Sequence, residues 1–257
     1  MRYFLELAYN GTRYSGYQEQ PNRITVQGAL EDALQLLLQH PTKVVGCGRT
    51  DAGVHALQYF VHFDAENVLH PNFLYRLNRV LSSDILCYRV LEVAPDAHAR
   101  FDATSRSYRY VVDAYQNPFR QETAYYCHYA HQLDINKMQE AAQLLLNYKD
   151  FNTFCKSQTD AKTKLCDLYE SYWEINKEEQ QLIYHVRANR FLRGMIRLIV
   201  GMCLNVGKGN LELSVVKEAL DQKQTLKRAL SAPATGLFLT DIRYDFVEAR
   251  PHDLLKL

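Results

Sequence analysis

Residue types that could do chemistry gather in the stretch CGRTDAGVHA, residues 47–56. Arg49 and Asp51 lie two residues apart, and Gly48 and Gly53 flank them. A carboxylate can act as a nucleophile or a general base, and a nearby arginine favours its ionised form. In a purely structural turn, Asp51 would instead bind backbone amides, Gly53 would take a positive φ, and Arg49 would be a surface charge. The stretch therefore indicates either a turn or a site whose reactive group is Asp51.

Hydrophobic periodicity predicts the elements that must hold this loop. In the N-terminal part, apolar side chains alternate along four segments and recur at helical spacing along two others. Thr25 is placed to cap the first helix, and Pro71 stands at the start of the second. The order βαββαβ is typical of the ferredoxin-like arrangement. The expected strands are residues 2–9, 43–47, 56–64 and 85–93, and the expected helices are 25–39 and 71–83.

The C-terminal part repeats this order more loosely. Asp134 is placed to cap its first helix, and further short helical pieces are expected within 214–230. We therefore predict an α+β fold of two ferredoxin-like halves, residues 1–104 and 105–257, whose antiparallel sheets lie side by side around a central cleft. The expected strands here are 107–115, 168–176, 182–188 and 237–246, and the expected helices are 134–147 and 190–206.

Composition narrows the class of protein. The 257 residues carry a formal net charge of +1 and are 47% hydrophobic, which is typical of an ordinary globular protein. The six cysteines lie far apart without a C-x-x-C pair, so neither a zinc site nor a disulfide framework is expected. The longest apolar run, residues 195–206, is too short to span a bilayer, and the N-terminus lacks a secretory signal pattern. We expect a cytoplasmic protein with reduced thiols and no membrane contact.

The loop sequence GRTDAGVHA closely resembles the signature of the tRNA pseudouridine synthases of the TruA type. Four further blocks resemble that family in the same order, so the resemblance extends over residues 3–244. The blocks are YNGTRYSGYQEQ…TVQGALEDAL (9–34), FDATSRSYRYVV (101–112), RFLRGMIRLIVGMCLNVGKG (190–209) and APATGLFLTDIRY (232–244).

This resemblance implies that the chain converts uridine to pseudouridine in the anticodon arm of tRNA, at positions 38, 39 and 40, with neither metal nor cofactor. It implies that Asp51 is the nucleophile, which attacks either C6 of the uracil or C1′ of the ribose. Arg49 would help to hold the flipped-out nucleotide, and Arg197 would pair with Asp51. Tyr108 would lie against the uracil as a candidate for removing the C5 proton, with Leu239 close by. A homodimer is also implied.

Several of these residues equally fit structural roles. Without the resemblance, Tyr108 is one of many packing tyrosines and Arg197 is a snorkelling arginine at the edge of the core. Arg13 and Gln18 could touch the RNA backbone or be solvated loop side chains. For His55 we expect a buried, hydrogen-bonded ring rather than a catalytic group.

Two rival functions stay open. QYFVHF, residues 58–63, faintly resembles the aromatic strand with which RRM domains stack bases, so the chain could be a non-catalytic RNA-binding module. Asp51 argues against that module, because a stacking surface has no use for a carboxylate that faces an anionic strand. The second rival is a pseudouridine synthase that acts on another RNA, since the motifs specify chemistry better than substrate.

Overall fold

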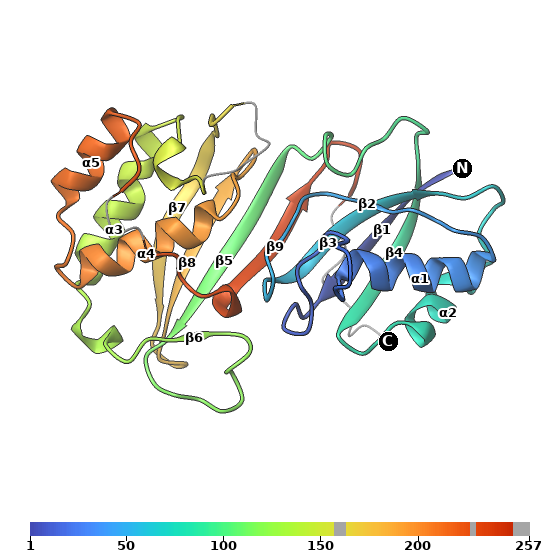
Figure 1. The fold of residues 1–257 in the computed structure, drawn as a ribbon, viewed down its shortest axis with the longest axis horizontal. Coiled ribbons are helices and arrows are strands. Elements are labelled where there is room, and N and C mark those ends of the chain that lie inside the picture. Colours follow the sequence, from blue (N-terminus) through green and yellow to red (C-terminus); the bar gives the residue numbers. More distant parts are fainter. Residues whose placement is uncertain (157–162, 227–229, 249–257) are drawn as a thin grey trace.

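One sheet of nine strands runs the length of the molecule in the part of the chain that the computed structural model describes, residues 1–156, 163–226 and 230–248 (Figure 1). The strands are β1 (Arg2–Tyr9), β2 (Val45–Gly46), β3 (His55–Asp64), β4 (Ile85–Val93), β5 (Ser105–Asp113), β6 (Tyr125–Tyr126), β7 (Leu168–Asn176), β8 (Gln181–Ala188) and β9 (Leu237–Arg243). Their order is β4-β1-β3-β9-β5-β8-β7, with β2 paired to β3 and β6 to β5. The predicted α+β class is confirmed.

Helices α1 (Val26–Leu38) and α2 (Phe73–Val80) pack on the N-terminal strands (Figure 1). The side chain of Thr25 caps α1 as expected, because its Oγ1 accepts a hydrogen bond from the Gly28 N–H at 3.2 Å. β2 is shorter than the expected strand 43–47. The backbone of Val44 bonds to side chains of α1 instead of the sheet: its N–H donates to Glu31 Oε1 at 3.1 Å, and its carbonyl accepts from Gln27.

The C-terminal part carries α3 (Ile135–Leu144), α4 (Met195–Gly207) and α5 (Leu213–Asp221). Asp134 caps α3 as expected, with its Oδ1 3.1 Å from the Lys137 nitrogen. The prediction that α4 begins at residue 190 is wrong. Gly194 takes a left-handed φ of +71° just before Met195, so the chain turns there before the helix starts. α5 confirms a further helical piece, while residues 227–229 of the expected stretch lie outside the described residues.

The two groups of strands meet through β9, which differs from the expectation of two separate sheets. On one edge β9 pairs with β5 in antiparallel fashion; on its other edge it pairs with β3 in parallel. The parallel contact is short and consists of His55 opposite Phe238 and Ala56 opposite Leu239. The sheet is therefore continuous, and the loop before β3 lies at the junction.

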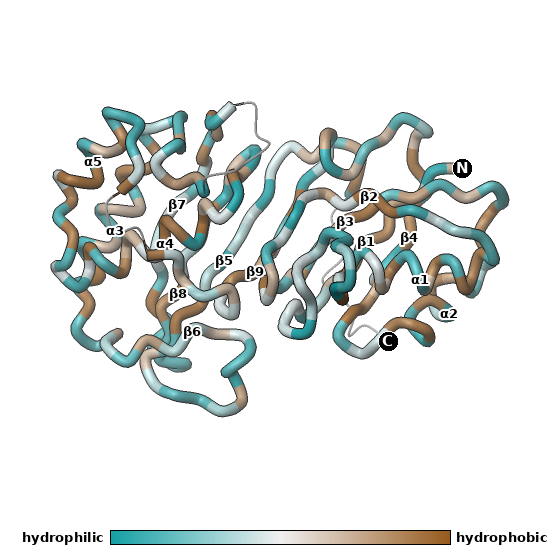
Figure 2. Tube along the Cα trace, in the orientation of Figure 1, coloured by the Kyte–Doolittle hydropathy of each residue, from teal (hydrophilic) through white to brown (hydrophobic). Residues whose placement is uncertain are grey.

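The hydrophobic core is divided into two large clusters. One contains Phe4, Leu30 and their neighbours under α1 and α2, and the other contains Tyr184 and Ile199 under α3 and α4. Along α5, hydrophobic and hydrophilic residues alternate as expected for a helix with one buried face, whereas most residues of α4 are apolar and buried (Figure 2). Within the described ranges, no helix combines the length and hydrophobicity needed to cross a membrane.

His62 links β3 to the segment that joins β4 and β5. Its ring is 5% exposed, and its Nδ1 accepts a hydrogen bond from the Ala99 N–H at 3.1 Å. Burial, together with the charges of Arg2 and His98, lowers the pKa of His62 from 6.5 to about 4. Protonation would abolish the acceptor, so the folded chain holds His62 neutral.

Stability should therefore fall as the pH falls below 6.5, because the unfolded chain binds the His62 proton between that value and about pH 4. Between pH 7.5 and 5 we expect His62 to account for about 1 to 2 kcal/mol of lost stability in urea unfolding. In His62→Asn, the side-chain oxygen can replace Nδ1 as acceptor without titrating. This variant should lose correspondingly less stability over the same range; an identical loss in both proteins would contradict the assignment.

Candidate active site

The loop of residues 47–54 crosses from β2 to β3 and contains the predicted nucleophile. Gly53 takes a φ of +76°, and the Val54 N–H donates to the Asp51 carbonyl at 3.2 Å, which closes the turn. Val54 is 3% exposed and belongs to the C-terminal hydrophobic cluster, although it precedes an N-terminal strand. The loop is therefore packed against both parts of the molecule.

Three tyrosines of the N-terminal part fix the backbone of this loop. The Tyr59 hydroxyl donates to the Gly48 carbonyl at 2.5 Å. The Tyr17 N–H donates to the Thr50 carbonyl at 3.2 Å, and the Tyr9 hydroxyl lies 2.9 Å from Thr50 Oγ1. These bonds hold the residues on either side of Arg49 in a defined place.

A close backbone approach supports the same geometry. Gly16 takes a φ of +95°, and a Cβ at this position would lie 2.7 Å from the Thr50 carbonyl oxygen. A larger residue would push the loop that precedes α1 away from the loop that carries Asp51.

Asp51 and Arg197 form an ion pair, in which Arg197 Nη1 lies 3.1 Å from Asp51 Oδ2. The side chains are 29% and 18% exposed, respectively, so the carboxylate is open to a substrate from one side. Arg197 stands in the first turn of α4, and its Nε donates to the Ala232 carbonyl at 2.7 Å. In a purely structural turn, the Asp51 carboxylate would accept hydrogen bonds from backbone amides. Here it accepts a hydrogen bond from Arg197 Nη1.

Tyr108 packs where both hydrophobic clusters meet, close enough to Asp51 for the charge of the carboxylate to act on its hydroxyl. Its ring packs edge-on against Phe191 with centroids 5.2 Å apart. Burial raises the pKa of Tyr108, and the charge of Asp51 adds to the rise, so the hydroxyl keeps its proton at neutral pH. Leu239 is opposite Tyr108 on β9 and is 2% exposed, which places it in the core beneath the site.

The remaining predicted residues lie on the surface near the loop. Arg49 is exposed between the fixed carbonyls of Gly48 and Thr50. Arg13 and Gln18 are exposed on the segment between β1 and α1, which contacts the Asp51 loop through Tyr17. These three side chains are accessible to a bound polyanion.

His55 is buried and hydrogen-bonded, as expected from the sequence. Its Nδ1 accepts from the Gly11 N–H at 3.1 Å, so Nε2 carries the proton and donates to the Thr235 carbonyl at 3.1 Å. Burial lowers the pKa of His55, and the ring stacks on Phe238. This histidine joins β3 to β9 and has no free nitrogen for catalysis.

Sequence reasoning missed Arg106, which contacts the start of the Asp51 loop. Its Nη2 donates to the Cys47 carbonyl at 3.0 Å. The residue stands two positions before Tyr108 in a strand pattern that offers no sign of a long-range partner.

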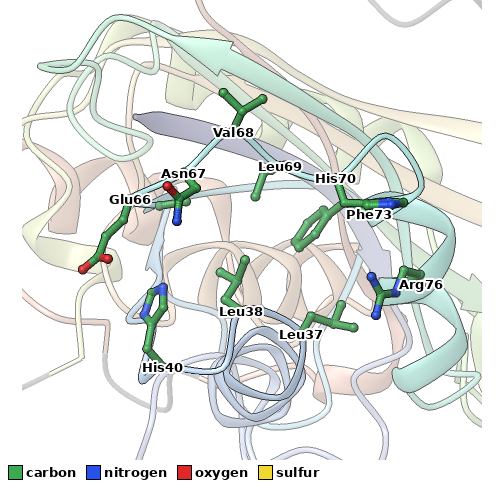
Figure 3. A pocket seen from close by; sticks show the side chains of 11 residues that line it. Leu37, Leu38, His40, Glu66, Asn67, Val68, Leu69, His70, Phe73 and Arg76 are labelled. Atoms are coloured by element: carbon green, nitrogen blue, oxygen red, sulfur yellow. The ribbon is translucent and has the colours of Figure 1, made fainter.

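A separate pocket of about 180 Å³ lies between the end of α1 and the chain that leaves β3 (Figure 3). Leu37, Leu38 and Phe73 line its apolar side, and none of the predicted site residues contributes to it. In the described part of the chain, no three His, Cys, Asp or Glu side chains gather in a way that could hold a metal ion. The side chains with reactive or charged groups that gather at the loop include Asp51, its partner Arg197 and the protonated Tyr108.

Comparisons with known proteins agree with the resemblance in the sequence. Residues 141–245 match the family model described as tRNA pseudouridine synthase. Over 245 residues, the chain is 43% identical to tRNA pseudouridine synthase A of Bacteroides fragilis, covering 95% of this chain and 96% of that protein. It is 36% identical over 244 residues to the protein of the same name from Exiguobacterium sibiricum, with 95% and 96% covered. The chain is therefore an enzyme of the isomerase class and belongs to the tRNA pseudouridine synthase A family.

Proposed function

We propose that this chain isomerises uridine to pseudouridine in the anticodon arm of tRNA, at positions 38, 39 and 40, with Asp51 as the nucleophile. The observation that carries the proposal is the partly exposed Asp51 carboxylate, paired with Arg197 at 3.1 Å beside Tyr108. Membership of the family supports the substrate, and the loop geometry supports the choice of reactive group.

The chemistry suits a carboxylate because the attacking group must also leave. Asp51 would form a bond to C6 of the uracil or to C1′ of the ribose, and the C1′–N1 bond would break. The base would then rotate and join C1′ through C5, and the bond between Asp51 and the substrate would break to restore the free carboxylate. N1 gains a proton and C5 loses one, so the reaction is balanced without an oxidant or reductant. Arg197 would keep the carboxylate aimed at the base through the 3.1 Å contact, both before attack and after release.

Tyr108 fits a packing role against the uracil better than the role of a resting base. A base must be deprotonated before it accepts a proton, and burial raises the pKa of this phenol. Its ring, backed by Phe191, offers a flat apolar surface for the extruded base. Leu239 would support that surface from beneath.

The exposed residues around the loop would bind the RNA itself. Extruding a nucleotide from its stack costs a few kcal/mol, and the exposed Arg49 would stabilise the extruded state. Arg13 and Gln18 would contact the sugar-phosphate backbone, which sets register and affinity rather than sequence preference. We also propose that the enzyme acts in the cytoplasm, as its membership of a family of tRNA-modifying enzymes suggests.

The burial of the aromatic residues of β3 argues against the alternative of an RRM-like RNA-binding module. The aromatic residues of the segment 58–63 are closed to solvent, with Tyr59 0%, Phe60 1% and Phe63 1% exposed. Base stacking on a sheet requires exposed rings.

We further propose two related halves, residues 1–104 and 105–257. The order β9-β5-β8-β7 repeats the order of β4, β1, β3 and β2, and each group has its own large hydrophobic cluster.

We also propose a homodimer, on resemblance to the family. Small-angle scattering at micromolar concentration should give twice the mass of the chain; the mass of a single chain would contradict the dimer.

Replacement of Asp51 by Asn should abolish catalysis while leaving tRNA binding intact. The assay is tritium release from tRNA carrying [5-³H]uridine, because the C5 hydrogen is lost during isomerisation. We expect a fall of about 10³-fold or more in the single-turnover rate, since an amide is a poor nucleophile. Asp32→Asn, on the exposed side of α1, is the matched control and should keep the wild-type rate. Tritium release by Asp51→Asn at the wild-type rate would assign the chemistry to another residue.

Replacement of Arg197 by Lys should lower the rate constant by about 10- to 100-fold with little change in tRNA affinity. The lysine keeps the charge, but one nitrogen cannot bond both the Ala232 carbonyl and Asp51 from the position of the guanidinium. Arg193→Lys, an exposed arginine of the same segment, serves as the control. An unchanged rate in Arg197→Lys would show that charge alone suffices.

A further inference from the structure

Arg106 uses its whole hydrogen-bonding capacity on backbone carbonyl groups. Nε and Nη2 donate to the Cys47 carbonyl at 3.3 and 3.0 Å. Nη2 also donates to the Arg100 carbonyl at 2.6 Å, and Nη1 donates to the carbonyls of Ala103 and Asn189 at 3.3 and 2.8 Å. A guanidinium carries five N–H groups, and these five contacts occupy all of them.

The four carbonyls belong to segments that position the candidate site. Cys47 begins the loop that carries Asp51, and Asn189 lies between β8 and the helix that carries Arg197. Arg100 and Ala103 lie on the segment that joins β4 to β5. One planar group therefore connects both partners of the ion pair to the strand that carries Tyr108.

Arg106 and Arg197 both contact the loop from the C-terminal part, and of these two arginines it is Arg106 that binds the backbone of the loop. The hydroxyls of Tyr9 and Tyr59 and the backbone of Tyr17 hold the loop from the N-terminal part. From the other side, Arg106 holds the Cys47 carbonyl and Arg197 holds the Asp51 carboxylate. Loss of Arg106 would leave the loop folded on its tyrosines but poorly aligned with Arg197.

The chemistry of these contacts explains why an arginine stands here. No carboxylate pairs with Arg106 among the described residues, so carbonyl dipoles alone compensate its partly buried charge. The planar guanidinium group of an arginine can donate hydrogen bonds to carbonyl groups in several fixed directions. A lysine has one nitrogen and cannot span the same four acceptors.

We propose that Arg106 is a positioning residue for catalysis, which aligns the Asp51 loop with Arg197 through the Cys47 carbonyl. This inference rests on the proposed role of Asp51. A displacement of about 1 Å between reacting groups can cost about 100-fold in rate, so a small shift of this loop suffices for a large effect.

The test compares Arg106→Lys with Arg2→Lys in the full-length protein. Arg2 also donates to a carbonyl of the joining segment, that of Ala97, and pairs with Asp64, but it has no contact with the loop. The readouts are the single-turnover rate of tritium release, the Kd for tRNA, and hydrogen exchange of peptides that cover residues 47–54. Arg106→Gln, which keeps an N–H donor without the charge, is a second variant if the lysine variant fails to fold.

We expect the Arg106 variant to lose about 10- to 100-fold in rate, to keep its Kd within about twofold, and to exchange faster in the loop. Arg2→Lys should keep both the rate and the loop exchange, even where its stability falls. Unchanged exchange of the loop in the Arg106 variant would overturn the inference, as would faster exchange with an unchanged rate. Wild-type protein that binds tRNA without releasing tritium would overturn the proposed function instead, and exchange would still decide whether Arg106 holds the loop.

Discussion

The ion pair between Asp51 and Arg197 depends on the alignment of two separately packed cores. The two residues are 146 positions apart in the chain, and each belongs to an element anchored in a different hydrophobic cluster. A 3.1 Å contact between them exists only if β3 and β9 pair correctly and Val54 is seated in the opposite core. The site therefore depends closely on how well the two parts fit, because the hydrogen bond within this ion pair is lost when the two atoms separate by about half an ångström more.

Most of the fold could be predicted from hydrophobic periodicity. The bounds of β1, β4 and β7 agree with the sequence prediction, because alternating patterns over eight or nine residues define a strand well. The failures have local causes that periodicity does not register. At Gly194 the backbone turns before α4, and at Val44 side chains of α1 replace the bonds of the sheet. The strands form one sheet because β9 pairs with both β3 and β5. The hydrophobic pattern of β9 predicts a strand but does not indicate which strands it pairs with.

Only part of the candidate site could be predicted from the sequence. The residue types around Asp51 indicated a reactive carboxylate, and a motif resemblance supplied its partners. Their distances follow from tertiary packing and could not be predicted. Arg106 shows the limit most clearly, because its acceptors lie 59, 6, 3 and 83 positions away and are backbone atoms, which have no residue-type signature.

The position of β9 has a consequence for how the chain is made. It is the last strand within the described residues, yet it occupies the middle of the sheet between β3 and β5. During synthesis, those two strands keep open edges until residues 237–243 have emerged, and open edges readily pair with other chains. A nascent or truncated chain that ends before β9 would therefore have two separate groups of strands, and the open edges of β3 and β5 could pair with other chains. The contacts of β9 with β3 and β5 therefore form late in the synthesis of the chain and protect both strand edges once they have formed.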